Sequence, residues 1–506
     1  ESSEEIANTL KGRAQKGISI KAKLGKIPEG APVFSVWNPS THARSGLVEV
    51  ILEAPKDWPK QSGITIIDAK GNRIAAQTVA KKTDEDLGVT FFTMRSHTRV
   101  NPRAFSFWAD DLPALGYRIY AAIPEETPAK TPLKWGANWA ENEFVMFKIA
   151  GNGSLTVEDK TSGAIFSGAG MFEDGGDRGG GYHFEAPAKD TVITSKDTKA
   201  KVELVEAGPA QVRFRVEVVM RIPERLSVRR TARAGKKSQL KMVTYVTLGA
   251  GSKSIKFRTQ VFNNAVDHRL RVIFPTGLKT DVIHVDGHFD VLERPISRDK
   301  KPWPTEHHLR WVELSDGATG LAVMNQGLPE YEVTDDKSRT ICLTLFRSNT
   351  YMTKEWWPTI KTPQAEFIGK SEYEYAVYVH GGDWKKGAVQ AEAEAAMLPA
   401  KIFQTHLTAP AGHDGELPSE QSFIAVDSNV AVTSIVKKAD NRDSMVIRLY
   451  NPDKAQTQAT IKTWKPIKKA YALNLWEEQT ESLTPANGTL KLKIPAKKIV
   501  TVEIVV

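Results

Sequence analysis

Cysteine is nearly absent from this chain: among 506 residues, Cys342 is the only one. A single thiol cannot build an internal disulfide framework or a thiolate metal cluster, so both kinds of stabilisation are excluded. Cys342 lies in the apolar stretch Thr-Ile-Cys-Leu-Thr-Leu-Phe, where we expect an inert buried thiol. One cysteine does not decide the redox compartment.

Long apolar runs are also missing. None reaches the roughly 18 to 20 residues that a membrane span requires. Glu1 starts a charged stretch rather than a basic and then apolar one, so no signal peptide is visible. We expect either a removed export segment or a chain that begins inside a longer polypeptide. The lysine-rich composition is consistent with a soluble enzyme of the bacterial cytoplasm or periplasm, and it leaves a homo-oligomer open.

Several catalytic and binding motifs do not occur. Gly179-Gly180-Gly181 lacks the Lys-Ser/Thr ending and the following helix of a phosphate-binding loop. No Gly-x-Ser-x-Gly elbow supports serine hydrolase chemistry. The net charge is +9, but the lysines are scattered without a recognition helix or an RNA-binding motif. We therefore expect a solvated basic surface and no nucleic-acid or membrane partner.

The abundant glycines and prolines and the alternating apolar residues of this chain are typical of β structure. Its 36 glycines and 27 prolines indicate many turns, and its length predicts roughly three domains. Apolar residues at 212, 214, 216 and 218 alternate with polar ones, which predicts antiparallel sheets with one apolar and one wet face. Further strands are expected at residues 33–37, 46–52, 64–67, 89–94, 117–123, 444–450 and 499–506, and a helix-like patch at 388–396.

The predicted organisation has four parts. Residues 1–27 are the short helical tail of a bundle or linker, weakened by Gly12 and Gly17. Residues 28–134 form a small immunoglobulin-like β-sandwich, and residues 135–410 a large central β unit. Residues 411–506 form a terminal β-sandwich.

Residues 172–187 are the most informative stretch, Phe-Glu-Asp-Gly-Gly-Asp-Arg-Gly-Gly-Gly-Tyr-His-Phe-Glu-Ala-Pro. This composition excludes a helix face or a plain strand, because glycines favour positive φ or a close approach to a neighbour. The acids, Arg178 and Tyr182 are groups that bind sugar hydroxyls. A functional sugar-binding loop and a solvated hairpin loop are both open.

Two further constellations have a plain structural alternative. His284, Asp286, His288 and Asp290 have a spacing that suits zinc on one strand face, yet a solvent-facing strand has the same pattern. His307-His308 cannot both face one ligand from a strand and are expected beside a turn after Trp303-Pro304.

Glycoside hydrolysis uses two acids flanking the scissile glycosidic bond. Clustered loop acids are more often solvated, and the candidates here are Glu173, Asp174, Asp177 and Glu185.

A collinear series of short stretches spans nearly the whole chain. It comprises Val36-Trp-Asn-Pro39, Arg44-Ser-Gly-Leu-Val-Glu49, Glu141-Asn-Glu-Phe144, Asp159-Lys-Thr-Ser-Gly163, Phe262-Asn-Asn264, Asp267-His-Arg-Leu-Arg271, residues 320–332, Leu343-Thr-Leu-Phe-Arg347, residues 375–384 and Val446-Ile-Arg-Leu-Tyr-Asn-Pro452. In this order they resemble the C-terminal half of glycoside hydrolase family 38, the zinc-dependent α-mannosidases.

The resemblance implies a mainly β fold: a large galactose-mutarotase-like supersandwich flanked by smaller sandwiches. It also implies that the nucleophile, the acid/base and the zinc ligands belong to an N-terminal barrel, so that no catalytic or metal residue maps onto this chain. The loop resembles the family's Gly-Asp-x-Tyr-x-Phe-x-Pro segment, which makes Tyr182 the substrate contact, with Asp177, Arg178 and Phe184 beside it. The spacing departs from the family pattern at Arg178 and the three glycines.

The function implied is the non-catalytic half of a retaining α-mannosidase, with an α-mannoside as substrate, Zn²⁺ as cofactor of the complete enzyme and a catalytic barrel as partner. This chain alone is then inactive. Three alternatives stay open: a stand-alone carbohydrate-binding β protein, a mutarotase-like epimerase using histidine and glutamate, and a split enzyme whose barrel is a separate chain. Linkage preference cannot be derived from the sequence.

Overall fold

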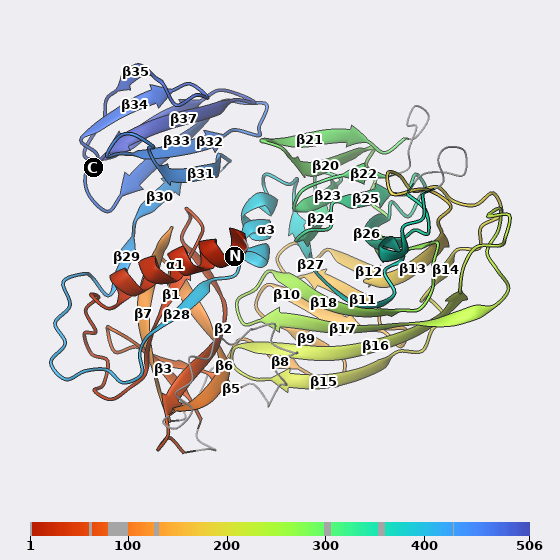
Figure 1. Ribbon diagram of the computed structural model, residues 1–506, viewed down its shortest axis with the longest axis horizontal. Helices are drawn as coiled ribbons and strands as arrows, with labels where there is room; N and C mark the ends of the chain where they lie inside the picture. Colours follow the sequence, from red (N-terminus) through yellow and green to blue (C-terminus); the bar gives the residue numbers. More distant parts are fainter. Residues whose placement is uncertain are drawn as a thin grey trace.

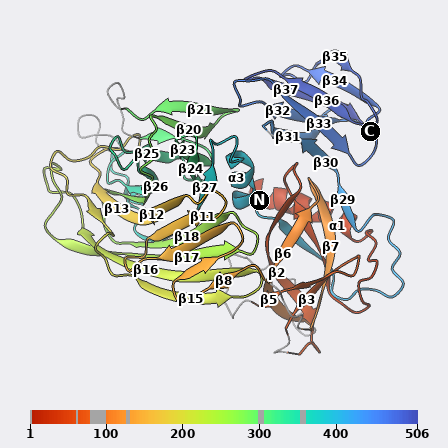
Figure 2. The same ribbon diagram turned by 180° about the vertical axis from the view of Figure 1, so that it is seen from behind.

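The computed structural model describes residues 3–59, 63–78, 100–125, 131–297, 305–352, 360–428 and 430–506. The chain is mainly β and forms three sandwich-like bodies, which are separate in the views of Figure 1 and Figure 2. This confirms the expected fold class of several β-sandwiches. The strand predicted at residues 89–94 lies outside the described residues.

The first sandwich packs two antiparallel sheets around one apolar core. Its larger sheet has the order β28-β1-β7-β3-β4, with β29 also paired to β7, and its smaller sheet has the order β2-β6-β5. The bounds are β1 (Val33–Asn38), β2 (Arg44–Pro55), β3 (Thr65–Asp68), β4 (Arg73–Ala75), β5 (Gln77–Thr78), β6 (Val100–Leu112), β7 (Gly116–Ile123), β28 (Lys401–His406) and β29 (Glu420–Ser422).

This core forms because alternate apolar residues of both sheets point inward. Phe34 of β1 stacks on Tyr120 of β7 at 5.9 Å between ring centroids, and Phe107 of β6 meets the same ring edge-on at 5.3 Å. All three side chains are fully buried. The predicted strands at 33–37, 46–52, 64–67 and 117–123 all fall on observed ones.

The first sandwich also takes in a segment from far along the chain. β28 pairs antiparallel with β1, so that Val36 lies opposite Ile402. The predicted division placed residues 401–406 in the central unit. In the structure these residues form β28, which belongs to the first sandwich because it covers the otherwise exposed edge of β1.

The central body has three sheets around one continuous core. Their orders are β12-β11-β10-β9-β8, β14-β13-β19-β26-β25-β22 and β15-β16-β17-β18-β27-β24-β23-β20-β21. The bounds are β8 (Lys134–Trp135), β9 (Trp139–Glu141), β10 (Val145–Ile149), β11 (Leu155–Asp159), β12 (Ile165–Ala169), β13 (Met171–Gly176), β14 (Ile193–Thr194), β15 (Lys201–Ala207), β16 (Gln211–Pro223), β17 (Lys237–Gly249), β18 (Ser254–Asn263), β19 (His268–Phe274), β20 (Val282–Gly287), β21 (Asp290–Pro295), β22 (Glu306–His307), β23 (Trp311–Ser315), β24 (Thr319–Asn325), β25 (Glu330–Val333), β26 (Ile341–Ser348) and β27 (Gly369–Gly381).

The polar face of the long sheet is not fully solvated, contrary to the expectation from alternation. Arg213 of β16 is 8% exposed and bonds Glu49 of β2 at 2.7 Å and Glu206 at 3.4 Å. The first sandwich covers this part of the face, and paired charges replace the missing water. The predicted alternation of apolar and polar residues was correct, but it could not show which part of the protein packs against the polar face of the sheet.

The C-terminal sandwich has its own core between sheets of order β30-β33-β36 and β31-β32-β37-β34-β35. The bounds are β30 (Ile424–Asp427), β31 (Val432–Lys438), β32 (Met445–Tyr450), β33 (Thr457–Thr463), β34 (Lys469–Leu473), β35 (Gln479–Leu483), β36 (Leu490–Ile494) and β37 (Ile499–Val505). Both strands predicted in this region are observed.

The described helices are α1 (Ser3–Ser19), the 3₁₀ turn η1 (Pro363–Glu366) and α3 (Val389–Met397). α1 lies within the helical tail expected at residues 1–27 and continues through Gly12 and Gly17. Its last turn packs Ile18 against the first sandwich, and such packing stabilises a short helix. α3 matches the predicted patch and lies where the three bodies meet in Figure 1 and Figure 2. Arg44 of the first sandwich donates to the carbonyl of Glu394 in α3 at 3.2 Å. None of the described helices combines the length and apolar character needed to cross a bilayer.

Candidate functional site

The glycine-rich stretch divides into a strand and a loop. Its first residues belong to β13, which pairs with β19 so that Asp174 lies opposite Leu270. The expectation that this composition excludes a plain strand was therefore wrong for residues 172–176, because inter-strand hydrogen bonds override the weak intrinsic propensity of this sequence. The loop follows from Asp177, and the Arg178 N–H donates to the Glu185 carbonyl at 2.8 Å to close it.

Asp177 is the anchor of this loop. Its side chain is fully buried. One carboxylate oxygen accepts N–H bonds from Gly179 at 2.9 Å and Glu185 at 3.3 Å, while the other accepts from Arg347 Nε at 2.7 Å. Burial raises the pKa of Asp177, and the Arg347 guanidinium opposes that shift. Both oxygens are engaged, so Asp177 fixes the backbone of the loop.

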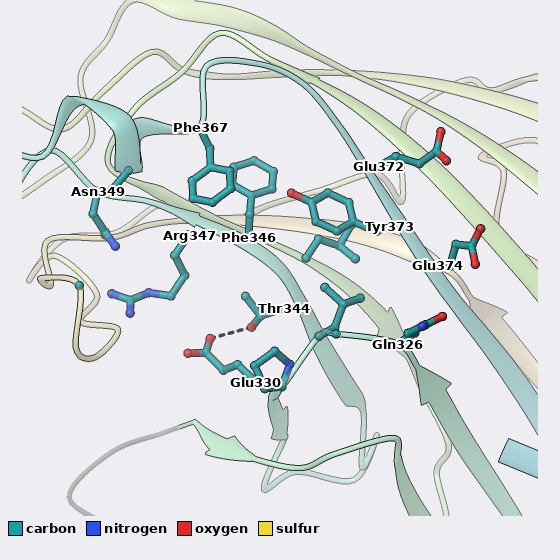
Figure 3. A pocket seen from close by; sticks show the side chains of 16 residues that line it. Gln326, Glu330, Thr344, Phe346, Arg347, Asn349, Phe367, Glu372, Tyr373 and Glu374 are labelled. Carbon is teal, nitrogen blue, oxygen red and sulfur yellow. Dashed lines mark hydrogen bonds between the residues drawn. The ribbon is translucent and has the colours of Figure 1, made fainter. Parts of the chain in front are cut away.

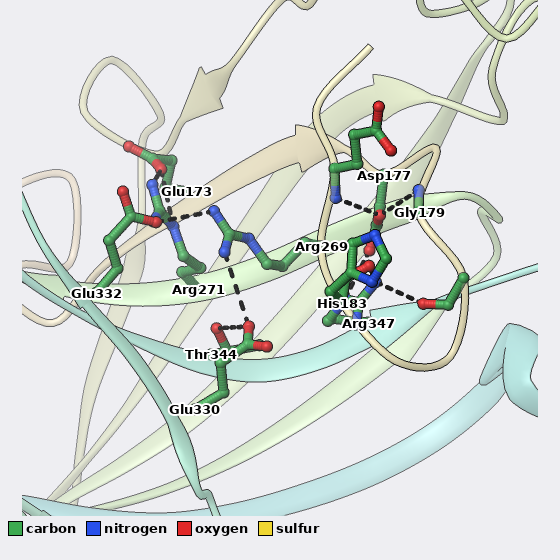
Figure 4. Close-up of polar contacts among 12 residues, drawn as sticks. Glu173, Asp177, Gly179, His183, Arg269, Arg271, Glu330, Glu332, Thr344 and Arg347 are labelled. Atoms are coloured by element: carbon green, nitrogen blue, oxygen red, sulfur yellow. Dashed lines mark hydrogen bonds and ion pairs between the residues drawn. The ribbon is translucent and has the colours of Figure 1, made fainter. Parts of the chain in front are cut away.

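Arg347 fastens the loop from the other side. It stands at the end of β26, and its Nη2 donates to the carbonyls of Gly180 at 2.9 Å and His183 at 2.6 Å. The Gly181 N–H donates to the Met352 carbonyl at 2.8 Å. Figure 4 shows Arg347 enclosed by the turn of the loop. Three backbone groups of a short loop are thus held by Arg347 and by Met352, which follows β26.

Phe184 and a cluster of arginines support the base of the loop. The Arg269 guanidinium lies 3.4 Å from the ring centroid of Phe184, which is 8% exposed. Arg269 and Arg271 both bond the same carboxylate oxygen of Glu332, at 3.2 Å and 2.6 Å (Figure 4). Burial and the neighbouring Arg271 lower the pKa of Arg269 to about 10. Phe184 therefore packs under the loop rather than at its tip.

Tyr182 has a different environment. It lies at the tip of the loop and is 76% exposed, although its neighbours Gly181 and His183 are held by backbone hydrogen bonds. Arg178 is partly exposed and lies 3.5 Å from Glu185. Of the four residues expected to bind substrate, Tyr182 is exposed, Arg178 is partly exposed and paired with Glu185, and Asp177 and Phe184 hold the loop. Direct contact with a sugar stays a prediction for all four.

The glycines of this loop allow neighbouring backbone and side-chain atoms to come close to the chain. No glycine from 175 to 181 has positive φ, so that part of the expectation was wrong. A Cβ on Gly179 would lie 2.2 Å from the His183 carbonyl oxygen, and one on Gly176 would lie 2.9 Å from the ring of Pro187. The turn is therefore too tight for any side chain at position 179.

The four acids considered as a glycosidase pair are each bound to a base. Glu173 pairs with Arg271, Asp174 with Arg233 and His268, Asp177 with Arg347, and Glu185 with Arg178. For Asp174 and Asp177, which are fully buried, such a partner offsets the cost of burying the charge.

The His284 constellation is split by a hairpin rather than displayed on one strand. His284 bonds Glu313 at 2.9 Å, Asp286 bonds Arg310 at 2.7 Å and Asp290 bonds Lys497 at 2.5 Å. Within the described ranges no group of three or more His, Cys, Asp or Glu is placed to hold a metal ion. His307 lies in β22, whereas His308 is buried after it, so the pair does not face one ligand.

Sequence reasoning did not single out Arg347 and Arg269 as site residues. Both stand in stretches that carry the family resemblance, at the end of Leu343-Thr-Leu-Phe-Arg347 and within Asp267-His-Arg-Leu-Arg271. An arginine in an otherwise apolar strand is a signal of a buried acid partner. The identity of that partner could not be read from spacing, since Asp177 is 170 positions away.

Comparison with known proteins extends this picture. The model described as "Glycosyl hydrolases family 38 C-terminal domain" matches residues 140–361, and "Glycosyl hydrolases family 38 C-terminal beta sandwich domain" matches residues 429–502. The first match includes the Tyr182 loop and Arg347, and the second covers most of the C-terminal sandwich.

Individual relatives agree. A candidate mannosylglycerate hydrolase of Halalkalibacterium halodurans is 28% identical over 412 residues, which are 77% of this chain and 44% of that protein. Human alpha-mannosidase 2C1 is 25% identical over 270 residues, 51% of this chain and 24% of that protein. The chain thus spans less than half the length of these relatives.

A solved alpha-mannosidase from Enterococcus faecalis V583 has the same fold, with a TM-score of 0.82 at 23% identity over 99% of this chain and 59% of that chain. Sequence models, relatives and fold agree on one assignment. The chain belongs to glycoside hydrolase family 38 and corresponds to the C-terminal half of its members.

Proposed function

We propose that this chain completes the sugar pocket of a retaining, zinc-dependent α-mannosidase whose catalytic barrel is a different stretch of polypeptide. The observation that carries the proposal is Tyr182, an exposed aromatic residue on a loop that is otherwise fixed. Its hydroxyl can donate to and accept from sugar hydroxyls, and its ring can lie against a pyranose face. The α-mannosidases among the relatives support this choice of sugar.

The loop would act by preorganisation. Asp177 and Arg347 hold its backbone before substrate arrives, so that little conformational entropy is lost on binding. A tyrosine held in this way restricts the position of the sugar relative to catalytic groups on another domain.

The described residues of this chain do not fit a zinc site, since none of their acids, histidines and Cys342 form a group that could hold a metal ion. In the best candidate spacing, His284, Asp286 and Asp290 are engaged by Glu313, Arg310 and Lys497 respectively. We therefore assign zinc, nucleophile and acid/base to the barrel, and to this chain the shape and stability of the pocket.

An assay with an aryl α-mannoside tests whether catalysis depends on the barrel and substrate binding on Tyr182. The isolated 506-residue chain should show no turnover with or without added zinc. In the complete enzyme, Tyr182→Phe removes one hydrogen bond and should lower kcat/KM about five- to tenfold, and Tyr182→Ala should lower it further. Tyr471→Phe in the C-terminal sandwich is the matched control. Zinc-dependent turnover by the isolated chain, or full activity of Tyr182→Ala, would contradict the proposal.

A further inference from the structure

A groove begins at the Tyr182 loop and runs along β26 and β27 (Figure 3). Its volume is about 700 Å³, within the range of small-molecule sites. Gly181, the residue before Tyr182, forms part of its wall. The groove therefore lies beside the loop that carries Tyr182.

One wall consists of aromatic rings. Phe346 stacks on Phe367 at 6.0 Å and 25°, and on Tyr373 at 6.3 Å and 13°. Figure 3 shows the three rings together at the upper side of the groove. Phe367 is 49% exposed, which leaves ring surface free for a ligand. Flat apolar surfaces of this kind match the C–H face of a pyranose ring.

Phe367 is also held in an unfavourable backbone conformation. It follows η1 with φ of 49°, a left-handed value that is rare for an aromatic residue. Asn263 Nδ2 donates to the Phe367 carbonyl at 3.1 Å, and Ser348 Oγ donates to the Glu366 carbonyl at 2.6 Å. Such conformations persist where surrounding bonds impose them, and they cluster at ligand sites.

The polar lining favours a neutral polyhydroxyl ligand. Glu330, Glu374 and Gln326 supply hydroxyl acceptors, and Asn349 has a buried side-chain carbonyl for which the described residues offer no hydrogen-bond partner. Arg347 is the one cation among the described residues that line the groove, and Asp177 already neutralises it. A phosphate or carboxylate would therefore meet acids without a free counter-charge.

We propose that this groove is a second sugar subsite, which binds the residue next to the mannose at Tyr182. The inference rests on the proposed function, because it takes the ligand class from there. It adds that the substrates are oligosaccharides with a neutral second sugar, stacked on Phe367 and bonded to Glu330 and Gln326.

Binding to the 506-residue chain tests the groove, because the residues proposed to bind the second sugar lie in this chain. Saturation-transfer NMR titrations would compare mannose, an α-linked mannotriose, mannose 6-phosphate and tetramethylammonium on the wild type, Phe367→Ala, Glu374→Gln and Tyr182→Ala. Circular dichroism and thermal melting confirm folding, and Tyr471→Phe in β34 of the C-terminal sandwich, outside the groove, is the matched control. We expect mannotriose to bind with a Kd on the order of millimolar, about tenfold tighter than mannose. Phe367→Ala should weaken it about fivefold to tenfold, as one ring face is lost.

The outcomes separate this inference from the proposed function. Mannotriose binding that is weakened by Tyr182→Ala but not by Phe367→Ala refutes the groove and leaves the α-mannosidase role intact. Equal affinity for mannose 6-phosphate refutes the neutral-ligand assignment, and preferred binding of tetramethylammonium makes the groove a cation site instead. No saturable binding of any sugar refutes the groove, while activity of the complete enzyme on an aryl mannoside still decides the proposed function independently.

Discussion

Removing the Arg347 side chain should release the Tyr182 loop without unfolding the domain. The guanidinium makes three hydrogen bonds to the loop, at 2.7, 2.9 and 2.6 Å. Each bond of this charged kind contributes about 1.5–3 kcal/mol, and breaking a buried ion pair costs about 3–5 kcal/mol. Asp177 keeps the N–H donors of Gly179 and Glu185, so we take the lower end, about 3 kcal/mol.

This loss should appear as local opening, because the loop is a surface segment that can detach from the core. About 3 kcal/mol corresponds to a roughly 100-fold larger opening constant. In Arg347→Met we therefore expect faster amide hydrogen exchange in peptides covering residues 177–187, with peptides of β16 and β17 unchanged. Hydrogen-exchange mass spectrometry measures both sets in one experiment.

Two comparisons sharpen this test. Arg178→Met removes a partly exposed pair of the same loop and should cost less than about 1 kcal/mol. The double variant Asp177→Asn/Arg347→Met should open less than the sum of its single variants, because the two residues act on each other. Unchanged exchange of residues 177–187 in Arg347→Met would show that the loop is not held as described.

Three further predictions follow from single positions. Gly179→Ala should disorder the loop, since its Cβ would meet the His183 carbonyl oxygen at 2.2 Å, whereas Gly181→Ala, with a nearest atom at 3.7 Å, should not; equal hydrogen exchange in both variants would contradict this. Burial lowers the pKa of His308 to about 3 in the folded protein. As the pH falls below 6.5, His308 therefore takes up a proton in the unfolded chain but not in the folded one, so the free energy of unfolding should decrease between pH 6.5 and 3. At pH 4.5 this loss amounts to roughly 3 kcal/mol, and urea unfolding at pH 7 and 4.5 should show a smaller pH dependence in His308→Gln than in the wild type. Burial raises the pKa of Cys342 to about 12, so a thiol reagent at neutral pH should label the chain only after denaturation; rapid labelling of the native protein would refute burial.

Local pattern determined most of the strands of this protein. An alternation of period two, as at residues 212–218, specifies which side chains share a face, and proline and glycine mark where strands end. Cys342 was expected in an apolar strand, and it is buried in β26 as predicted. The loop of Tyr182 was also visible in the sequence, because so many glycines and acids fit no regular element. These features depend on neighbours along the chain, which is why sequence alone carries them.

Contacts between distant segments decided the rest. Alternation predicted that Arg213 faces water, but only the packing of β2 against β16 shows that Glu49 covers it. Asp177 was grouped with the sugar-binding residues of its loop, yet Arg347, 170 positions later, draws it into the interior. A charged side chain is solvated or paired according to what lies opposite, and that neighbour is set by the fold rather than by spacing. The tertiary structure thus separated Tyr182, which faces outward, from the residues that hold it.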